Sequence, residues 1–224
     1  MNSNMRAYFL PAPEITSYCT DTFIGSVAQG GSVNCDRVLL YPHGNGTHTE
    51  CVGHISPQPY WIADCLCTVF AIGRLITVTP VQTAEGLAIT ADQLQGIFDD
   101  PDITAAVIRT LPNEKTKSTR DWSGSNPPYM TVEAAELLRL QGIEHVLIDL
   151  PSLDPESDGG ALRAHRAFWN YPEAPRLHAT ITEMCYIPSA ILDGLYLVQI
   201  SVLPLESDAS PAQVVLYPAT CIQQ

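Results

Sequence analysis

Three of the six histidines in this chain lie within twelve residues, together with a carboxylate. The segment reads His43-Gly-Asn-Gly-Thr-His48-Thr-Glu50-Cys-Val-Gly-His54. If the chain is extended at His48, that histidine and Glu50 point to the same side, and the glycines let His43 and His54 fold back onto them. Imidazole and carboxylate without a thiolate form the ligand set of a catalytic Zn²⁺ or Mn²⁺ site that keeps a position open for water. The alternative is a polar loop whose histidines are merely solvated.

Strands and short helices surround this cluster. A β-rich run over residues 32–41 leads directly into it. Residues 64–80 are interpreted as two apolar strands hinged near Gly73, and the polar segment 112–129 as a loop of functional length. A capped helix over 131–142 precedes a buried strand over 143–150. The pattern further predicts short helices over 90–98 and 162–169 and strands over 103–111, 179–184, 194–204 and 213–218.

The composition limits the classes of partner. With 224 residues, 46% of them hydrophobic and 16% charged, the chain is expected to form one domain over residues 1–224. Its net charge of −13 repels phosphate backbones and anionic lipid, so we expect neither nucleic acid nor membrane as a partner. The N-terminal residues lack the apolar core of a signal peptide. The seven cysteines, an odd number, are expected to be reduced thiols in a cytoplasmic protein.

Five residues outside the cluster have both a functional and a structural interpretation. Trp122 is either a stacking surface for an aromatic substrate, which would make it substrate-binding, or a packing plug. His145 lies in a predicted buried strand and is expected to be a satisfied core histidine, and His178 is expected at the surface. Lys115 and Lys117 are expected to be solvated rather than to attract an anionic substrate.

The chain resembles the cyclase family of metal-dependent hydrolases, which contains bacterial kynurenine formamidase (arylformamidase) and isatin hydrolase. The motif of that family is His-x-Gly-Thr-His-x-Asp-x-Pro-x-His, and Gly46-Thr47-His48 and His54 match its spacing. The resemblance implies an α/β fold of the swivelling β/β/α type, a mixed sheet curled toward a barrel with a few covering helices. The later matching blocks, in family order, are 129–138, 142–149, 152–155 with His165, and 181–184.

The resemblance also implies roles for individual residues. His48 would be a metal ligand, and Glu50 would take the place of the Asp that binds or bridges metals. His165 and Glu183 would complete a site for one or two Zn²⁺ or Mn²⁺ ions. His54 would be the general base or a proton shuttle.

The chain departs from the family motif on both sides of His48. The family's first ligand lies four residues before the Gly-Thr-His histidine, and Gly44 stands there in this chain. His43 is one place further out, so it serves as a ligand only if the glycine-rich loop bulges. Glu50 is one methylene longer than the family's Asp, and Val52 replaces its Pro.

The expected function is therefore hydrolysis of a small amide, formamide or cyclic amide by a metal-activated water, as in N-formylkynurenine cleavage in tryptophan catabolism. Family members assemble as homodimers or homotetramers, which is the expectation here too. One alternative is a lactonase or another cyclase-family hydrolase with a different small substrate. Another is a binding protein that kept the fold without turnover.

Overall fold

A seven-stranded barrel forms the body of the protein. The computed structural model describes residues 5–219. The strands follow the order β10-β3-β12-β11-β4-β7-β9 and close on themselves, with parallel pairing from β4 through β7 and β9 to β10 and antiparallel pairing elsewhere. The expected α/β fold with a mixed sheet curled into a barrel and few helices is confirmed. The barrel strands are β3 (His48–Glu50), β4 (Phe70–Val78), β7 (Ala105–Thr110), β9 (His145–Ile148), β10 (Thr180–Glu183), β11 (Gly194–Val202) and β12 (Ala209–Pro218).

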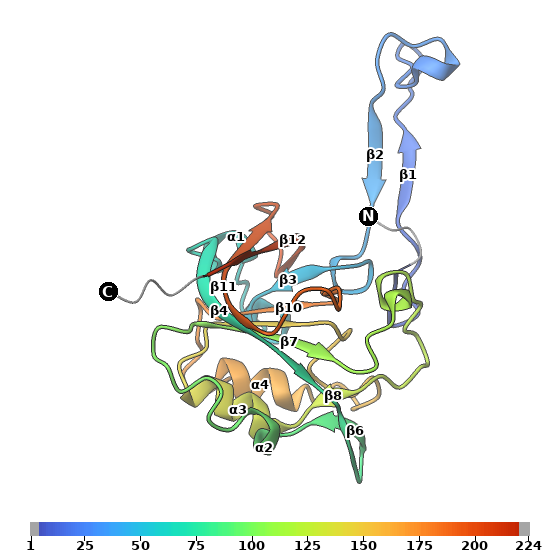
Figure 1. The fold of residues 1–224 in the computed structure, drawn as a ribbon. Coiled ribbons are helices and arrows are strands. Elements are labelled where there is room, and N and C mark those ends of the chain that lie inside the picture. Colours follow the sequence, from blue (N-terminus) through green and yellow to red (C-terminus); the bar gives the residue numbers. More distant parts are fainter. Residues whose placement is uncertain (1–4, 220–224) are drawn as a thin grey trace.

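Side-chain alternation along the strands divides the core in two. Val107 and Leu147 point into the barrel, while Ile108 and Ile148 pack toward the helices. Three helices lie together on one side of the barrel (Figure 1). They are α2 (Ala91–Leu94), α3 (Val132–Leu140) and α4 (Arg163–Trp169). The Oγ1 of Thr131 accepts the backbone N–H of Ala134 at 3.3 Å, which caps α3 as the sequence predicts.

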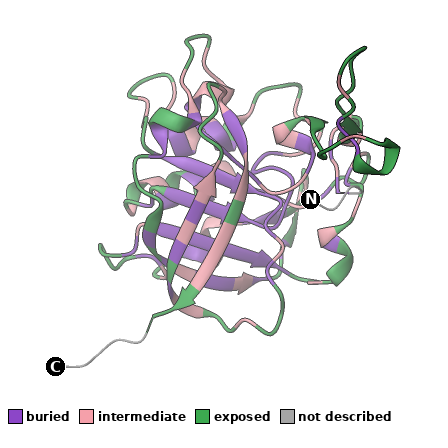
Figure 2. Cartoon of the chain, turned by 90° about the horizontal axis from the view of Figure 1, so that it is seen from above, coloured by how far each residue is buried: buried purple, intermediate pink, exposed green. Residues whose placement is uncertain are grey.

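A two-stranded arm, residues 14–39, projects from the body. It consists of β1 (Glu14–Ser17) and β2 (Asp36–Leu39), which pair antiparallel, with the short helix η1 (Val27–Gln29) toward its tip. Figure 1 shows the arm standing away from the barrel, and Figure 2 shows that most of it is exposed. Ile15 and Val38 lie opposite each other and are 64% and 54% exposed. Both faces of the arm are therefore uncovered, and one of them carries this apolar pair.

The remaining elements are short. The sheet β5-β6-β8 lies beside the helices, and three 3-10 helices occur in the loops. None of the helices within residues 5–219 is both long and apolar enough to cross a membrane. The bounds are β5 (Val81–Thr83), β6 (Gly86–Ile89), β8 (Tyr129–Met130), α1 (Ile62–Cys65), η2 (Pro42–Gly44), η3 (Val52–His54) and η4 (Lys115–Ser118).

Residues 64–80 are not two strands hinged near Gly73. They contain the end of α1 and the single strand β4, which runs straight through Gly73. A Cβ atom at Gly73 would lie 2.4 Å from Val198 Cγ2 and 3.1 Å from Ala105 Cβ. The glycine is needed because neighbouring strands pack closely there, not because the chain bends.

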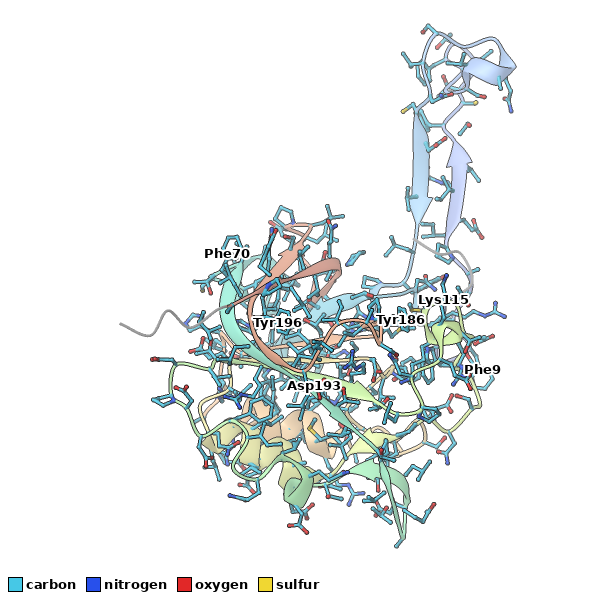
Figure 3. The ribbon with its side chains drawn as sticks, viewed as in Figure 1. Phe9, Phe70, Lys115, Tyr186, Asp193 and Tyr196 are labelled. Carbon is cyan, nitrogen blue, oxygen red and sulfur yellow. The ribbon has the colours of Figure 1, made fainter. Side chains whose placement is uncertain are left out.

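The polar segment 112–129 is anchored to the barrel by a lysine. Lys115 is exposed, as expected (Figure 3), but the prediction that Lys117 is solvated is wrong, since it is only 6% exposed. The Lys117 Nζ donates to the Thr110 backbone carbonyl at 2.6 Å and to Asp149 Oδ2 at 2.8 Å. The lysine thereby joins the segment to the ends of β7 and β9.

Candidate metal centre

Two neighbouring strands place the central candidate ligands of the site. His48 and Glu50 alternate with Thr49 along β3, so both side chains lie on the outer face of the barrel toward α4. Antiparallel pairing with β10 sets Glu183 directly opposite His48. His48 Nε2 lies 3.4 Å from Glu183 Oε2. The β-strand period and the strand register together create this part of the site.

Two tight turns bring the flanking histidines back to Glu50. The 3-10 turn η2 holds His43, and Gly46 follows with a φ of +114°, a conformation that favours glycine. His43 Nδ1 reaches Glu50 Oε2 at 2.9 Å, so the loop does bulge enough to bring this shifted histidine to the site. The turn η3 carries His54, whose ring centroid is 4.2 Å from that of His43.

Helix α4 contributes His165 from the second half of the chain. Its Nε2 lies 3.0 Å from Glu50 Oε1 and 3.5 Å from Glu183 Oε1. Asp154 accepts the backbone N–H groups of Ala164 and His165 and also contacts His165 Nδ1. Asp154 therefore fixes both the start of α4 and the ring orientation of His165, an arrangement common behind metal-bound histidines.

Asp208 is a further carboxylate at the site. It lies in the turn between β11 and β12, and its Oδ2 is 2.7 Å from His43 Nε2 and 3.5 Å from His54 Nδ1. Sequence reasoning missed this residue because a lone Asp in a turn carries no local signal. Asp154 lies within a matched sequence block, but its contact with His165 becomes visible only in three dimensions.

The charges of the cluster are strongly interdependent. Burial alone would lower the pKa of His43, but its hydrogen bonds to Asp208 and Glu50 raise that pKa to about 10. Burial would raise the pKa of Glu50, yet the charge of His54 and the hydrogen bonds from His165 and His43 hold it well below its usual range. Protons would therefore compete with a divalent cation for the same imidazole lone pairs, and any cation affinity is expected to fall as pH falls.

The orientation of His48 supplies a test of whether the residues fit a metal. Its Nδ1 lies 3.0 Å from the carbonyl oxygen of Gly46, to which it donates a hydrogen bond, so the lone pair of a neutral ring sits on Nε2. Within residues 5–219 this buried Nε2 has no hydrogen-bond partner. It faces Glu183, and a lone pair opposite a carboxylate is unfavourable unless a cation lies between them.

Two overlapping sets of ligand atoms converge closely enough for a cation. We call His48, Glu50 and Glu183 the inner triad and His43, Glu50 and His54 the outer triad; in each, the ligand atoms lie within 4.8 Å of one another. Glu50 belongs to both. Histidine and carboxylate ligands of this kind suit Zn²⁺ or Mn²⁺, so the donor set fits the metals expected from the sequence.

A cavity of about 200 Å³ opens beside the triads. Its lining combines ionisable side chains with a few apolar ones. Tyr8 forms part of the wall, and its hydroxyl donates to the Pro151 carbonyl at 2.9 Å. The lining residues are Tyr8, His43, His54, Ser152, Pro155, Glu156, Asp158, Leu162, His165 and Glu183.

Three candidate residues from the sequence are not brought to this cavity. Trp122 is 3% exposed and packs in the core, and the residues that line the cavity do not include it. His145 bonds Thr180 Oγ1 at 2.9 Å, and its burial, with a smaller contribution from Arg176, lowers its pKa to about 4. This confirms His145 as a core histidine. His178 is exposed, as expected, and contacts Cys67.

Two bacterial enzymes named kynurenine formamidase are similar to this chain over most of its length. The kynurenine formamidase of Bacillus cytotoxicus is 24% identical over 194 residues, covering 85% of this chain and 83% of that protein. The enzyme of the same name from Bacillus thuringiensis is 23% identical over 197 residues, covering 86% and 84%.

Solved structures share the fold. A predicted metal-dependent hydrolase from Bacillus stearothermophilus superposes with a TM-score of 0.66 at 19% identity, covering 96% of this chain and 92% of that one. An isatin hydrolase bound to the product analogue thioisatinate gives a TM-score of 0.63 at 14% identity, covering 97% and 89%. The Cyclase family, described as "Putative cyclase", matches residues 3–155, which is more than half of the sequence. With this match and the histidine and carboxylate site on a shared fold, the chain belongs to the Cyclase family.

Proposed function

We propose that this chain is a metal-dependent hydrolase that cleaves a small amide, formamide or cyclic amide. The observation that carries the proposal is the convergence of the inner and outer triads beside a cavity. At about 200 Å³ the cavity is smaller than the roughly 300–1,000 Å³ of sites for drug-sized ligands, which favours a small substrate. The relatives named kynurenine formamidase make N-formylkynurenine the first compound to test.

The residues of the inner triad, together with His165, would hold a Zn²⁺ or Mn²⁺ ion. Such an ion, when bound, lowers the pKa of a coordinated water toward about 7 and polarises a carbonyl oxygen. Asp154 keeps the His165 ring turned toward Glu50 and Glu183. The walls at Tyr8 and Leu162 exclude bulk water from one side of the cavity and orient the substrate.

His54 is the proposed proton carrier. It lines the cavity, and its side chain is 28% exposed, so it has access to substrate. Its Nδ1 is 3.5 Å from Asp208 Oδ2 and 3.9 Å from Glu50 Oε2, so two carboxylates flank this ring nitrogen. In this role His54 takes a proton from the attacking water and returns it to the leaving amine.

The test combines metal analysis with a substrate panel. Protein purified without chelator is expected to contain Zn²⁺ or Mn²⁺ and to hydrolyse N-formylkynurenine or simple aryl formamides. The His54→Ala variant is expected to keep the ion held by the inner triad and to lose about 10²–10⁴-fold in kcat, the usual contribution of a general base. Cyclic amides complete the panel, and hydrolysis of lactones in place of amides identifies the alternative substrate class. Protein that stays metal-free and inert to every compound after Zn²⁺ or Mn²⁺ is added refutes the proposal.

We also propose that two copies associate through the arm. An isolated two-stranded hairpin is marginally stable in water, and this one exposes a row of large apolar side chains. Figure 3 shows the side chains of the arm standing clear of the body. The exposed apolar residues of the arm are Ile15, Tyr18, Ile24, Val27, Val33, Val38 and Leu39. A separate observation concerns location. The six described cysteines are all free thiols, which supports a cytoplasmic location for the chain.

Charging one face of the arm tests this assembly. The Ile15→Lys/Val38→Lys variant places two charges on directly opposite residues and is expected to halve the mass measured by light scattering. Thr16→Lys, on the other face beside Arg37, is the matched control and is expected to leave the mass unchanged. A wild-type chain that is monomeric at micromolar concentration contradicts the proposal.

A further inference from the structure

The turn between β11 and β12 supplies the site with a side chain from outside the family match. The match ends at residue 155, and Asp208 lies well beyond it. The turn is tied to the histidine-rich segment, because the backbone carbonyl of Asp208 accepts the Cys51 N–H at 3.0 Å. The neighbouring Ser207 carbonyl accepts the Ile62 N–H at 2.8 Å. These bonds hold the Asp208 carboxylate in place.

The contact between Asp208 and His43 decides which nitrogen of His43 carries the proton. Asp208 Oδ2 lies 2.7 Å from His43 Nε2, and Glu50 Oε2 lies 2.9 Å from His43 Nδ1. A neutral imidazole has one N–H and one lone pair. When a cation replaces the proton between His43 and Glu50, the Nε2 hydrogen stays with Asp208, and the Nδ1 lone pair is left for the cation beside Glu50, the shared residue of the two triads.

His43 needs such a partner more than the other histidines do. It stands one residue away from the family's ligand position, on the short turn η2, and its side chain is 29% exposed. By contrast, His48 and His165 are buried, and each has its Nδ1 bound by the Gly46 carbonyl or by Asp154. Asp208 gives His43 the equivalent anchor.

We propose that Asp208 is a positioning residue that fixes the His43 tautomer and thereby makes the outer triad a cation site. This rests on the proposed metal-dependent function but adds a residue that the family motif lacks. Carboxylates that orient a metal-bound histidine typically contribute 10–100-fold to metal affinity. If Asp208 acts by orienting His43 and does not bind the cation itself, substitutions at the two positions are expected to have non-additive effects on cation affinity.

A double-mutant cycle on cation affinity tests the proposal. Mn²⁺ and Zn²⁺ affinities and the number of ions bound are measured by titration calorimetry and chelator competition. Asp208→Ala is expected to weaken the binding of an ion at the outer triad by about 10–100-fold. Asp208→Asn, which still offers an acceptor oxygen, is expected to restore part of the loss. In a His43→Gln background, Asp208→Ala is expected to have a much smaller effect, limited to what its 3.5 Å contact with His54 contributes.

The controls separate this inference from the proposed function. Glu206→Gln removes an exposed carboxylate two residues away in the same turn and is expected to bind like the wild type. The thermal midpoint of each metal-free variant shows whether folding is intact. Full additivity of Asp208→Ala and His43→Gln, or unchanged affinity in Asp208→Ala, overturns the positioning role while the hydrolase stands. A wild-type chain that binds no cation overturns both.

Discussion

The Glu50→Gln variant is expected to lose both cation binding and hydrolytic activity. Glu50 is fully buried, and its two oxygens face different imidazoles, with Oε1 3.0 Å from His165 Nε2 and Oε2 2.9 Å from His43 Nδ1. Because Glu50 belongs to both triads, removing its charge weakens cation binding at both of them. A group that only supports a ligand contributes up to 100-fold, so we expect a loss of roughly 100-fold or more in affinity and in kcat/KM.

Cation titration and initial rates on the best substrate of the panel measure this effect. Glu173→Gln removes the same charge from an exposed residue in the loop after α4 and is the matched control. The thermal midpoint of metal-free Glu50→Gln identifies any folding defect. If the variant binds cations and hydrolyses substrate as the wild type does, Glu50 is not the shared centre of the site.

The two departures from the family motif meet in this one residue pair. His43 stands one position before the family's ligand, and Glu50 is one methylene longer than the family's Asp. The distance of 2.9 Å between His43 Nδ1 and Glu50 Oε2 shows that the longer carboxylate reaches the displaced histidine. Two substitutions that look like losses in sequence therefore support each other in the folded chain.

Local sequence signals predicted much of the fold. The Thr131 cap and the Gly142 stop correctly framed α3, and the apolar run after it correctly predicted β9. Both depend on neighbouring residues and on backbone preferences, which the sequence displays directly. The clustering of His43, His48 and His54 around Glu50 was visible for the same reason, since these residues lie within one short segment.

The remaining features depend on contacts between distant segments. Asp208 lies 165 residues from His43 in sequence, and no local pattern marks it as a partner. Gly73 looks like a hinge in sequence, because its packing against Val198 and Ala105 is set by the barrel register. The exposed arm was also not predicted, since large apolar side chains such as Ile15 and Val38 are normally buried.

Lys117 provides the largest expected effect on stability. The lysine and Asp149 are 32 residues apart in sequence, and both are buried, with Nζ 2.8 Å from Oδ2. Asp149 also accepts the Thr110 N–H and hydroxyl, so it holds the ends of β7 and β9 together. Lys117→Met leaves this buried carboxylate without its counterion, which costs about 3–5 kcal/mol. At about 2–4 °C per kcal/mol for a chain of this size, Tm is expected to fall by about 6–20 °C.

Two further variants attribute this loss to the buried charge rather than to the loop. Lys115→Met removes an exposed lysine from the same turn, and its free energy of unfolding is expected to stay within about 0.5 kcal/mol of the wild type. Lys117→Met/Asp149→Asn removes both charges and is expected to be more stable than Lys117→Met alone, because an uncompensated buried carboxylate costs more than a neutral amide that keeps part of its hydrogen bonding to Thr110. Equal Tm values for Lys117→Met and Lys115→Met in thermal unfolding would mean that Lys117 does not anchor the segment. A double variant no more stable than Lys117→Met would instead locate the cost in the lost lysine hydrogen bonds to Thr110.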